Sequence, residues 1–309
     1  WADGSPALDY TVNAAIGIPL ITGPQDEPRP VNHVLPAWDF LTGALAAFNL
    51  TAAVMRRRQT GEGAEIRLPL SDVAAASLAN MGKLAESLFI GDRARLGNDI
   101  YGAFGRDFLC ADGVRLMVTA ITPRQWAGLV KALGLGEAVA ALETELGADF
   151  SRNEANRFDH RARLYPLFEA AFAERTSTDL GPAFDESGVT WSRYQALSEA
   201  AHDPRLFDGN PIFQTIAQVS GLTYPAAGPS ATLAGEPRGA VQPAPRLGQH
   251  TDEVLAGVLG LPSSDLTEAC RPFACASGVR RCNRSPGAIA RLSPTAPHPL
   301  SQLRRRLLQ

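Results

Sequence analysis

Lysine is nearly absent from this sequence, whose 309 residues include only Lys83 and Lys131. Its 29 basic and 32 acidic residues give a formal net charge of −3. A nucleic-acid-binding domain shows a clear excess of basic side chains, usually gathered on one face. We therefore expect no nucleic-acid partner, and an anionic small molecule would need positive charge that is gathered locally.

Cysteine is also scarce, with Cys110 in the body of the chain and Cys270, Cys275 and Cys282 near its end. Their spacing fits no paired metal-ligand pattern, and the five histidines are scattered. Cys110 belongs to a predicted strand, "DFLCADG", where a free cysteine behaves as a small apolar residue. We expect no metal site and no disulfide framework, and a reducing cytoplasm as the location.

Several other signals are missing. No apolar run approaches the length of about 18 residues that a membrane span requires, so no membrane association is expected. The sequence contains neither a phosphate-loop GxxxxGK[ST] nor a G-x-S-x-G elbow, and "GAFGRD" and "TGEGAE" lack the context of a dinucleotide fingerprint. With 45% hydrophobic residues the chain can still bury a sizeable core.

The two ends of the sequence differ from its body. The chain starts with Trp1 and has no basic-then-apolar leader, so its numbering is expected to begin inside a longer gene product. Residues 269–309 hold eight arginines and no Asp or Glu, which leaves 21 basic and 32 acidic groups, a net charge of −11, in residues 1–268. We expect residues 262–309 to be a disordered or non-native tail, with a basic interaction arm as the alternative.

The clearest periodic segment predicts an amphipathic helix from Phe40 to Arg58. Its apolar residues recur three or four positions apart: Leu41, Leu45, Phe48, Ala52 and Met55. Asp39 directly precedes this segment and is expected to cap it, because an aspartate accepts hydrogen bonds from the first free backbone N–H groups. A catalytic role for Asp39 is the less common alternative at such a position.

Weaker patterns predict the other elements. Alternating apolar residues predict a strand over 64–70, and Ser71 or Asp72 is expected to cap a helix over 72–89. The patterns then predict a hairpin arm at 112–121, a helix starting at Pro123, mostly helical structure over 135–187, strands at 189–195 and 210–218, and a helix capped by Thr251. Helices and strands in this sequence indicate an α/β layered fold.

One histidine and one glycine-rich loop accompany Asp39. His33 lies six residues before it and could serve as a general base, although a lone loop histidine is more often structural. The stretch "GNDIYGAFGRD" brings several glycines together, where a backbone can approach a ligand closely. These residues alone support no more than an enzyme-like α/β protein.

Longer motifs go further. The run "PAWDFLTGALAAFNLTAAVMRRRQTGEGAEIRLPLSDV" resembles the central signature of the family III CoA transferases, in which an Asp is followed by TG, a helix and an [RQ]TGxG turn. The motifs "DYTVN", "GIPLITGP", "VNHVLPAWD", "GNDIYGAFGRDF", "VTWSRY" and "PAPRLGQHTDEVL" are similar, in order over about residues 3–261, to one branch of that family. Enzymes of this branch move CoA between the two carboxyl groups of one branched, unsaturated five-carbon dicarboxylate.

The resemblance implies a fold and an assembly. The fold would be part of a Rossmann-like large domain plus a smaller inserted α+β domain, in an interlocked homodimer. It would divide the chain into large-domain residues 1–95 with Asp39, a small domain over 96–205, and a return to the large domain over 206–261. Family members also have a further part before the first of these segments, which supplies much of their CoA-binding surface.

The resemblance also implies a chemistry. Asp39 falls on the family's nucleophile, which accepts CoA as an aspartyl thioester, so acyl-CoA and dicarboxylate molecules would be the substrates and no cofactor is needed. The implied reaction converts 2-methylfumaryl-CoA (mesaconyl-CoA) to 3-methylfumaryl-CoA, with intermolecular transfer to another acid, or an inactive fragment, as alternatives. The racemase branch has a histidine at the position of Leu8, which argues against racemisation. Candidates for binding substrate or CoA are Asn32, His33, Gly97, Asn98, Tyr101, Gly102 and Gly105.

Overall fold

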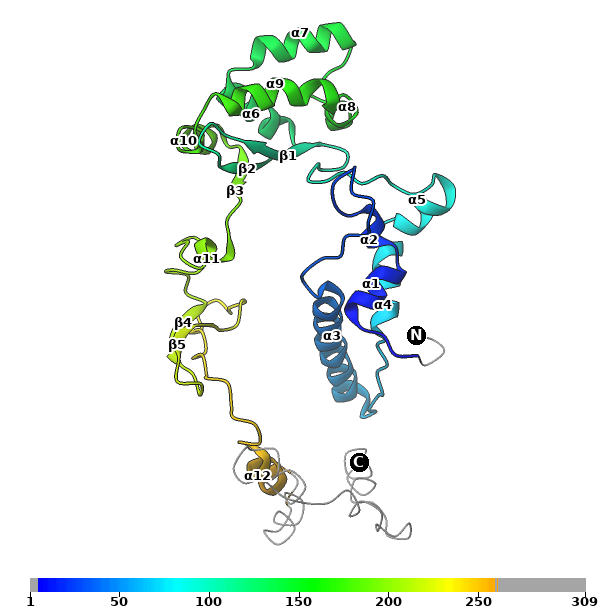
Figure 1. The fold of residues 1–309 in the computed structure, drawn as a ribbon. Coiled ribbons are helices and arrows are strands. Elements are labelled where there is room, and N and C mark those ends of the chain that lie inside the picture. Colours follow the sequence, from blue (N-terminus) through cyan, green and yellow to red (C-terminus); the bar gives the residue numbers. More distant parts are fainter. Residues whose placement is uncertain (1–4, 259, 261–309) are drawn as a thin grey trace, which may run out of the picture. The chain divides into compact units, whose positions relative to one another are not determined.

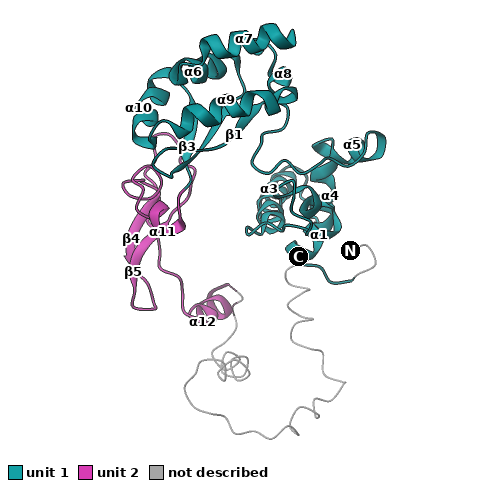
Figure 2. Cartoon of the chain, turned by 45° about the horizontal axis from the view of Figure 1, so that its top comes forward, with its two compact units in different colours: residues 1–194 teal, residues 195–309 magenta. Residues whose placement is uncertain are grey.

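The computed structural model describes residues 5–258 and 260, and the chain forms two compact units, residues 1–194 and 195–309 (Figures 1 and 2). Helices and strands mix in both units, as the expected α/β class requires. The expected domain limits at residues 95, 205 and 261 stay a prediction. The predicted tail, with Cys270, Cys275 and Cys282, lies outside the described residues.

The first unit begins with five helices: α1 (Asp9–Ala15), α2 (Ile18–Ile21), α3 (Ala37–Thr60), α4 (Leu70–Asn80) and α5 (Lys83–Phe89) (Figure 1). α1 contacts α2, α3 and α4. A small core joins these helices, formed by Val12 of α1, Trp38 of α3 and Ala74 of α4. This core fixes α1 against the start of α3, the segment that contains Asp39.

The predicted helix over 40–58 is confirmed as α3, but the predicted cap is wrong. Pro36 occupies the N-cap position, and Asp39 is the third residue of the helix. The helix ends at Gly61, whose φ of +78° is readily adopted only by glycine and whose N–H donates to the Arg57 carbonyl. Sequence periodicity located this helix well, whereas the residue that caps it comes from elsewhere in the chain.

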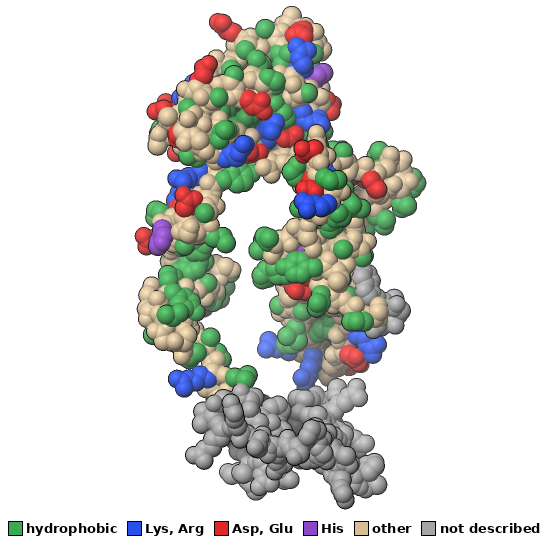
Figure 3. Space-filling model, in the orientation of Figure 1, with side chains coloured by type: hydrophobic (Ala, Val, Ile, Leu, Met, Phe, Trp, Pro, Cys, Tyr) green, Lys and Arg blue, Asp and Glu red, His purple; other side chains and the backbone are tan. Residues whose placement is uncertain are grey.

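α3 is apolar and mostly exposed. Among the residues that the structure describes, it alone meets the length and hydropathy of a membrane span, which corrects the expectation that no segment does. Of its 24 residues only Trp38 is buried, and Phe40 and Phe48 are 67% and 69% exposed. Hydrophobic side chains are visible over the α3–α5 part in Figure 3. A helix with this composition suits burial against protein as well as against lipid.

Three predictions for residues 64–89 are wrong. Residues 64–69 form no strand, and no ladder partner for them occurs between residues 5 and 258. The next helix starts at Leu70 with Pro69 at its N-cap position, so neither Ser71 nor Asp72 caps it. The single helix expected over 72–89 is two helices, because the chain turns at Gly82 with a φ of +75°.

A three-stranded antiparallel sheet follows, with the order β1 (Phe104–Leu109), β2 (Arg115–Ala120), β3 (Thr190–Arg193). Phe104 pairs with Ala120, and Leu116 pairs with Arg193. The helices that accompany it are α6 (Pro123–Leu133), α7 (Gly136–Leu146), α8 (Glu154–Asp159), α9 (Arg161–Ala173) and α10 (Ser177–Ser187). The hairpin arm, the strand at 189–195, the helix from Pro123 and the helical stretch 135–187 are thus confirmed.

An aromatic core holds this sheet to its helices. Phe104 and Phe108 of β1 are buried against Trp126, Phe168 and Phe172, with ring centroids 4.5–6.3 Å apart in the contacting pairs. Contacts of α9 with β1, of α6 with β2 and of α10 with β3 bring these side chains together. Most of the buried hydrophobic side chains of the described residues belong to this core.

The second unit contains α11 (Leu197–Ala200), the antiparallel pair β4 (Phe213–Ala217) and β5 (Thr223–Ala227), α12 (Thr251–Glu253) and the π-helical turn η1 (Val254–Val258). β4 confirms the strand predicted at 210–218. Thr251 is the first residue of α12, with His250 at its N-cap position, so the predicted Thr251 cap is wrong. A backbone turn, in which the Thr251 N–H donates to the Gly248 carbonyl, starts this short helix instead.

Candidate active site around Asp39

Asp39 lies in the first turn of α3, and its side chain is exposed. The first backbone N–H groups of a helix lack partners within the helix and carry a partial positive charge. A carboxylate in this turn therefore lies near the positive end of the helix dipole. The position gives Asp39 both access to solvent and a favourable local field.

The cap of α3 comes from Asp9, 30 residues earlier in the chain. Asp9 Oδ2 accepts hydrogen bonds from the backbone N–H groups of Trp38 at 2.6 Å and of Asp39 at 3.2 Å. Asp9 is the first residue of α1 and only 2% exposed. The carboxylate that caps α3 is thus that of Asp9, a buried residue of another helix, and not that of Asp39 as predicted.

An amide pair continues this network. The indole Nε1 of Trp38 donates to Asn13 Oδ1 at 3.1 Å, and Asn13 Nδ2 donates to Asn32 Oδ1 at 2.5 Å. Asn13 is fully buried. The side chain of the predicted binding residue Asn32 is therefore linked to Trp38, at the start of α3, by two hydrogen bonds through Asn13.

His33 joins the same cluster through Asp9. Its Nε2 lies 3.7 Å from Asp9 Oδ1, and its ring centroid lies 6.0 Å from that of Tyr10. Both ring nitrogens are buried and have no hydrogen-bond partner, and the same is true of Asp9 Oδ1. The structure places His33 beside the carboxylate that caps α3. In the described part of the chain, no hydrogen bond or ion pair joins His33 to Asp39.

Sequence reasoning assigned no role to Asp9 and Asn13. Both lie in the motif "DYTVN", and a spacing of four places them on the same face of a helix. Two polar residues on the buried face of a short helix are a signal of a specific polar contact, since such groups need hydrogen-bond partners. The identity of their partners, Trp38 and Asp39, follows only from the structure.

The glycine-rich loop makes contacts of its own. The Gly97 N–H donates to the Gly23 carbonyl at 3.0 Å, with Gly97 at a φ of +59° and Gly102 at +77°. A Cβ at Gly105 would lie 2.6 Å from Ile100 Cδ1 and 3.0 Å from the Val118 carbonyl oxygen, so a larger residue there would have to displace the Ile100 side chain. Within residues 5–258, no hydrogen bond, ion pair or ring contact links Gly97, Gly102 or Gly105 to Asp39.

Asn98 and Tyr101 are likewise engaged locally. Asn98 Nδ2 donates to Asp107 Oδ1 at 2.9 Å, and Asp107 also pairs with Arg115. The guanidinium of Arg93 lies 3.2 Å from the centre of the Tyr101 ring. These contacts shape the loop, and ligand binding by either residue stays a prediction.

Positive charge is gathered on both sides of this loop. Arg106 and Arg161 lie 3.6 and 3.7 Å from the two carboxylate oxygens of Asp99, and burial raises the pKa of Asp99 despite them. Arg93 and Lys83 pair with Glu86, which lowers the pKa of that glutamate. The local basic residues that an anionic ligand would need are present, although each of those named here already has an acidic partner.

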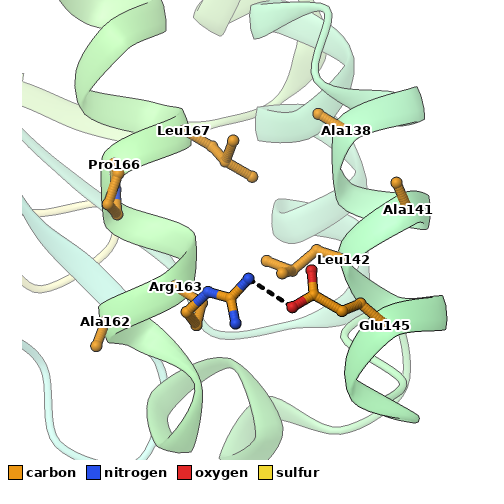
Figure 4. Close-up of a pocket in the computed structure, with 8 residues that line it drawn as sticks. All are labelled: Ala138, Ala141, Leu142, Glu145, Ala162, Arg163, Pro166 and Leu167. Atoms are coloured by element: carbon orange, nitrogen blue, oxygen red, sulfur yellow. Dashed lines mark hydrogen bonds and ion pairs between the residues drawn. The ribbon is translucent and has the colours of Figure 1, made fainter.

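A separate groove of about 440 Å³ lies between α7 and α9 (Figure 4). Alanines and leucines line it, and an ion pair of Glu145 with Arg163 at 2.7 Å crosses it. None of the predicted site residues lies among its lining residues. Across residues 5–258 no group of three or more His, Cys, Asp or Glu side chains is placed to hold a metal ion.

Comparison with known proteins identifies the family of this chain. The model of CoA-transferase family III matches residues 1–251. The chain is 44% identical over 266 residues to 2-methylfumaryl-CoA isomerase of Chloroflexus aurantiacus, and this alignment covers 85% of the chain and 65% of that enzyme. It is 27% identical over 260 residues to succinyl-CoA–D-citramalate CoA-transferase of the same organism, covering 81% and 60% of the two chains. The chain thus spans a little under two thirds of the length of these curated relatives.

Solved structures agree on the fold. A CaiB/BaiF family protein from Brucella suis superposes with a TM-score of 0.62 at 22% identity, covering 81% of this chain and 62% of that one. Rv3272 from Mycobacterium tuberculosis superposes with a TM-score of 0.64 at 20% identity, covering 81% and 64%. By family model, sequence identity and fold together, the chain belongs to CoA-transferase family III.

Proposed function

We propose that this chain transfers CoA between carboxyl groups, with Asp39 as the nucleophile, and that it converts 2-methylfumaryl-CoA to 3-methylfumaryl-CoA. The observation that carries the proposal is the exposed carboxylate of Asp39 in the first turn of a helix whose start is held by a buried carboxylate. The 44% identity to an enzyme named for this isomerisation supports the choice of substrate.

The chemistry follows from the carboxylate. Asp39 attacks the thioester carbonyl, and CoA leaves as a thiolate, which gives a mixed anhydride. The thiolate then attacks the aspartyl carbonyl, which releases the substrate carboxylate and leaves an aspartyl-CoA thioester. The other carboxylate of the same dicarboxylate repeats both steps in reverse, so the new thioester forms and Asp39 is regenerated. Charge and electrons balance without a metal or redox cofactor.

The remaining site residues have proposed parts in this scheme. Asn32 and His33, which contact Asn13 and Asp9 near the start of α3, are proposed to bind the substrate carboxylates. Backbone N–H groups near Gly97, Gly102 and Gly105 are proposed donors to the oxyanions that form at each attack. Asn98 and Tyr101 would support that loop through their contacts with Asp107 and Arg93.

Intermolecular transfer is the second candidate, favoured by the relatives that are named as CoA-transferases. The two reactions differ in the fate of free acid. Incubation with unlabelled 2-methylfumaryl-CoA and isotope-labelled free dicarboxylate would leave the product unlabelled in the intramolecular reaction. Label in the CoA ester would indicate intermolecular transfer.

The covalent intermediate provides the direct test. Incubation of the chain with 2-methylfumaryl-CoA and hydroxylamine should convert the activated Asp39 carboxyl to a hydroxamate, detectable by intact mass and peptide mapping. The adduct should be missing in the Asp39→Asn variant. A wild-type chain that forms no adduct at any position would contradict the proposal and favour an inactive fragment.

We further propose that the chain forms a homodimer that covers the apolar surface of α3 and α5. Phe48 is 69% exposed, and Phe89 and Ile90 are 86% and 87% exposed. Large apolar side chains exposed side by side usually mark an interface. Light scattering should give a mass of about twice 32.9 kDa.

The dimer has a matched control. Phe48→Glu should shift the mass toward one chain, whereas Leu197→Glu, at a leucine that is 91% exposed outside these helices, should leave it unchanged. A wild-type monomer, or equal effects of the two variants, would contradict this interface.

The cytoplasm stays the proposed location. Cys110 is 3% exposed, and burial raises the pKa of its thiol to about 11. A buried thiol held in its neutral form is chemically unreactive, as a structural cysteine in a reducing compartment would be.

A further inference from the structure

α3 begins without a capping side chain of its own. Pro36, at the N-cap position, has no side-chain atom that could accept a hydrogen bond from the first backbone N–H groups of the helix. The N–H groups of the second and third residues, Trp38 and Asp39, would then lack partners. Because the second of these groups belongs to the proposed nucleophile, whatever binds it also restrains the backbone that carries the reacting carboxylate.

We propose that Asp9 is a positioning residue for CoA transfer: from α1 it binds both N–H groups and thereby fixes Asp39. This inference rests on the proposed function of Asp39 and assigns a second residue to the same site. Asp9 Oδ2 lies 2.6 Å from the Trp38 nitrogen and 3.2 Å from the Asp39 nitrogen. A carboxylate that is only 2% exposed is costly to bury without hydrogen bonds, and these two bonds satisfy one of its oxygens.

α1 is packed and hydrogen-bonded against α3, which fixes the position of Asp9. Val12, fully buried, packs in one core with Trp38 and Ala74, and Asn13 binds the Trp38 indole. The nucleophile's helix and the capping helix are therefore joined by a packed core and by three hydrogen bonds. In reactions that need a carboxylate at a fixed distance and angle from a thioester, small displacements cost much of the rate.

The other oxygen of Asp9 extends the role to His33. Asp9 Oδ1 has no hydrogen-bond partner and faces His33 Nε2 at 3.7 Å. One buried carboxylate thus restrains the backbone of Asp39 with one oxygen and faces the neighbouring histidine with the other. Its effect on the reaction is exerted through these two residues.

Two substitutions separate the possible contributions of Asp9. Asp9→Asn keeps a carbonyl oxygen that can accept from both N–H groups, whereas Asp9→Leu keeps a similar shape and removes every acceptor. Val12→Ala is the matched control, because it loosens the same core and leaves all acceptors in place. Circular dichroism of each variant checks that the helices persist.

The first readout does not depend on catalysis. Hydrogen exchange at the amides of Trp38 and Asp39 is compared with exchange at Phe48 and Asn49 in the middle of the same helix. We expect Asp9→Leu to lower the relative protection of the first pair about fivefold or more, because the helix loses its cap. Asp9→Asn should preserve the relative protection within about twofold, because the cap is retained. Val12→Ala should change both pairs alike.

The second readout is the rate of hydroxamate formation at Asp39, measured with the dissociation constant for the acyl-CoA. Asp9→Leu should slow adduct formation about tenfold with an unchanged dissociation constant, and Asp9→Asn should restore most of the rate, since positioning acts on the reacting geometry. An unchanged exchange ratio in Asp9→Leu, or equal losses in the Asn and Leu variants, would overturn the proposal.

These readouts keep the two proposals distinct. If the wild-type chain forms no adduct, the proposed CoA transfer fails, whereas the exchange ratios still decide whether Asp9 holds the backbone of Asp39. If the adduct forms at the wild-type rate in Asp9→Leu, the positioning role fails and the transfer reaction stands. Should Asp9→Leu not fold, Asp9→Ala replaces it, and an unchanged relative protection of the Trp38 and Asp39 amides in that variant would overturn the proposal.

Discussion

Asp39→Ala is expected to slow CoA transfer by at least about 10³-fold, because removal of the nucleophile of a covalent mechanism leaves no alternative route through the enzyme. The loss should appear in the rate of product formation at saturating acyl-CoA, while the affinity for acyl-CoA changes little. Conversion of 2-methylfumaryl-CoA, followed by chromatography of the CoA esters, measures both quantities. Residual activity within about tenfold of the wild type would show that another group carries the CoA.

α4 offers a close control for this substitution. Asp72 is also an exposed aspartate and also the third residue of its helix, as Asp39 is in α3. Asp72→Ala should leave the rate unchanged and alter stability by no more than a surface substitution in a first helical turn, within about 0.5–1 kcal/mol. Equal losses in the two variants would mean that the effect reflects helix stability and not chemistry. Asp39→Glu adds a finer test, since it keeps the carboxylate and displaces it by one methylene.

Arg157→Ala is expected to destabilise the sheet-containing part of the first unit by about 3–4 kcal/mol. Arg157 is fully buried, and its guanidinium donates to the carbonyls of Phe150 and Ile121 at 2.6 Å each. It also lies 5.4 Å from the Trp126 ring, and burial lowers its pKa. Alanine would leave a cavity and two buried carbonyls without donors, and both effects lower the free energy of unfolding.

Arg157→Met separates these two effects. Methionine fills most of the volume and removes a buried cation, so we expect a smaller loss of about 1–2 kcal/mol. Hydrogen exchange of the β1 and α6 amides reports the unfolding of this part alone. Arg163→Met on the neighbouring helix α9 is the surface control, with an expected change within about 1 kcal/mol because its partner Glu145 is also exposed. Equal losses for the Ala and Met variants at position 157 would assign the effect to the hydrogen bonds rather than to the cavity.

The sequence predicts those elements whose determinants are local. The helix from Pro123 carries its own start signal, since Thr122 accepts from the Gln125 N–H in a capping box. The β1–β2 hairpin likewise joins segments that are close in sequence. The same reasoning fails where an element depends on a distant part of the chain. The alternation of apolar residues over 64–70 predicts a strand, but among the described residues no neighbouring strand is present to pair with it.

The candidate site shows the same division. Asp39 is located by the family motif, and the structure places Asn32 and His33 in the polar network of Asp9, Asn13 and Trp38. The binding roles of Asn32 and His33 stay predictions. Asp9 could not be assigned a partner from the sequence, because Asp39 lies 30 residues later and α2 intervenes between α1 and α3. Contacts between distant segments are fixed by packing, which a single sequence does not display.

Because the cap of α3 comes from Asp9 and not from position 36, the residues at positions 9 and 36 are expected to depend on each other in evolution. A proline at position 36 presets the backbone for the approach to α3 and offers no acceptor, so it can persist only while position 9 supplies one. A Ser, Thr or Asp introduced at position 36 would release position 9 to vary. The order of the two replacements would then matter, since loss of Asp9 first leaves an intermediate chain with a loosened nucleophile. On the proposed role of Asp39, selection on it therefore extends to Asp9, a residue of another helix.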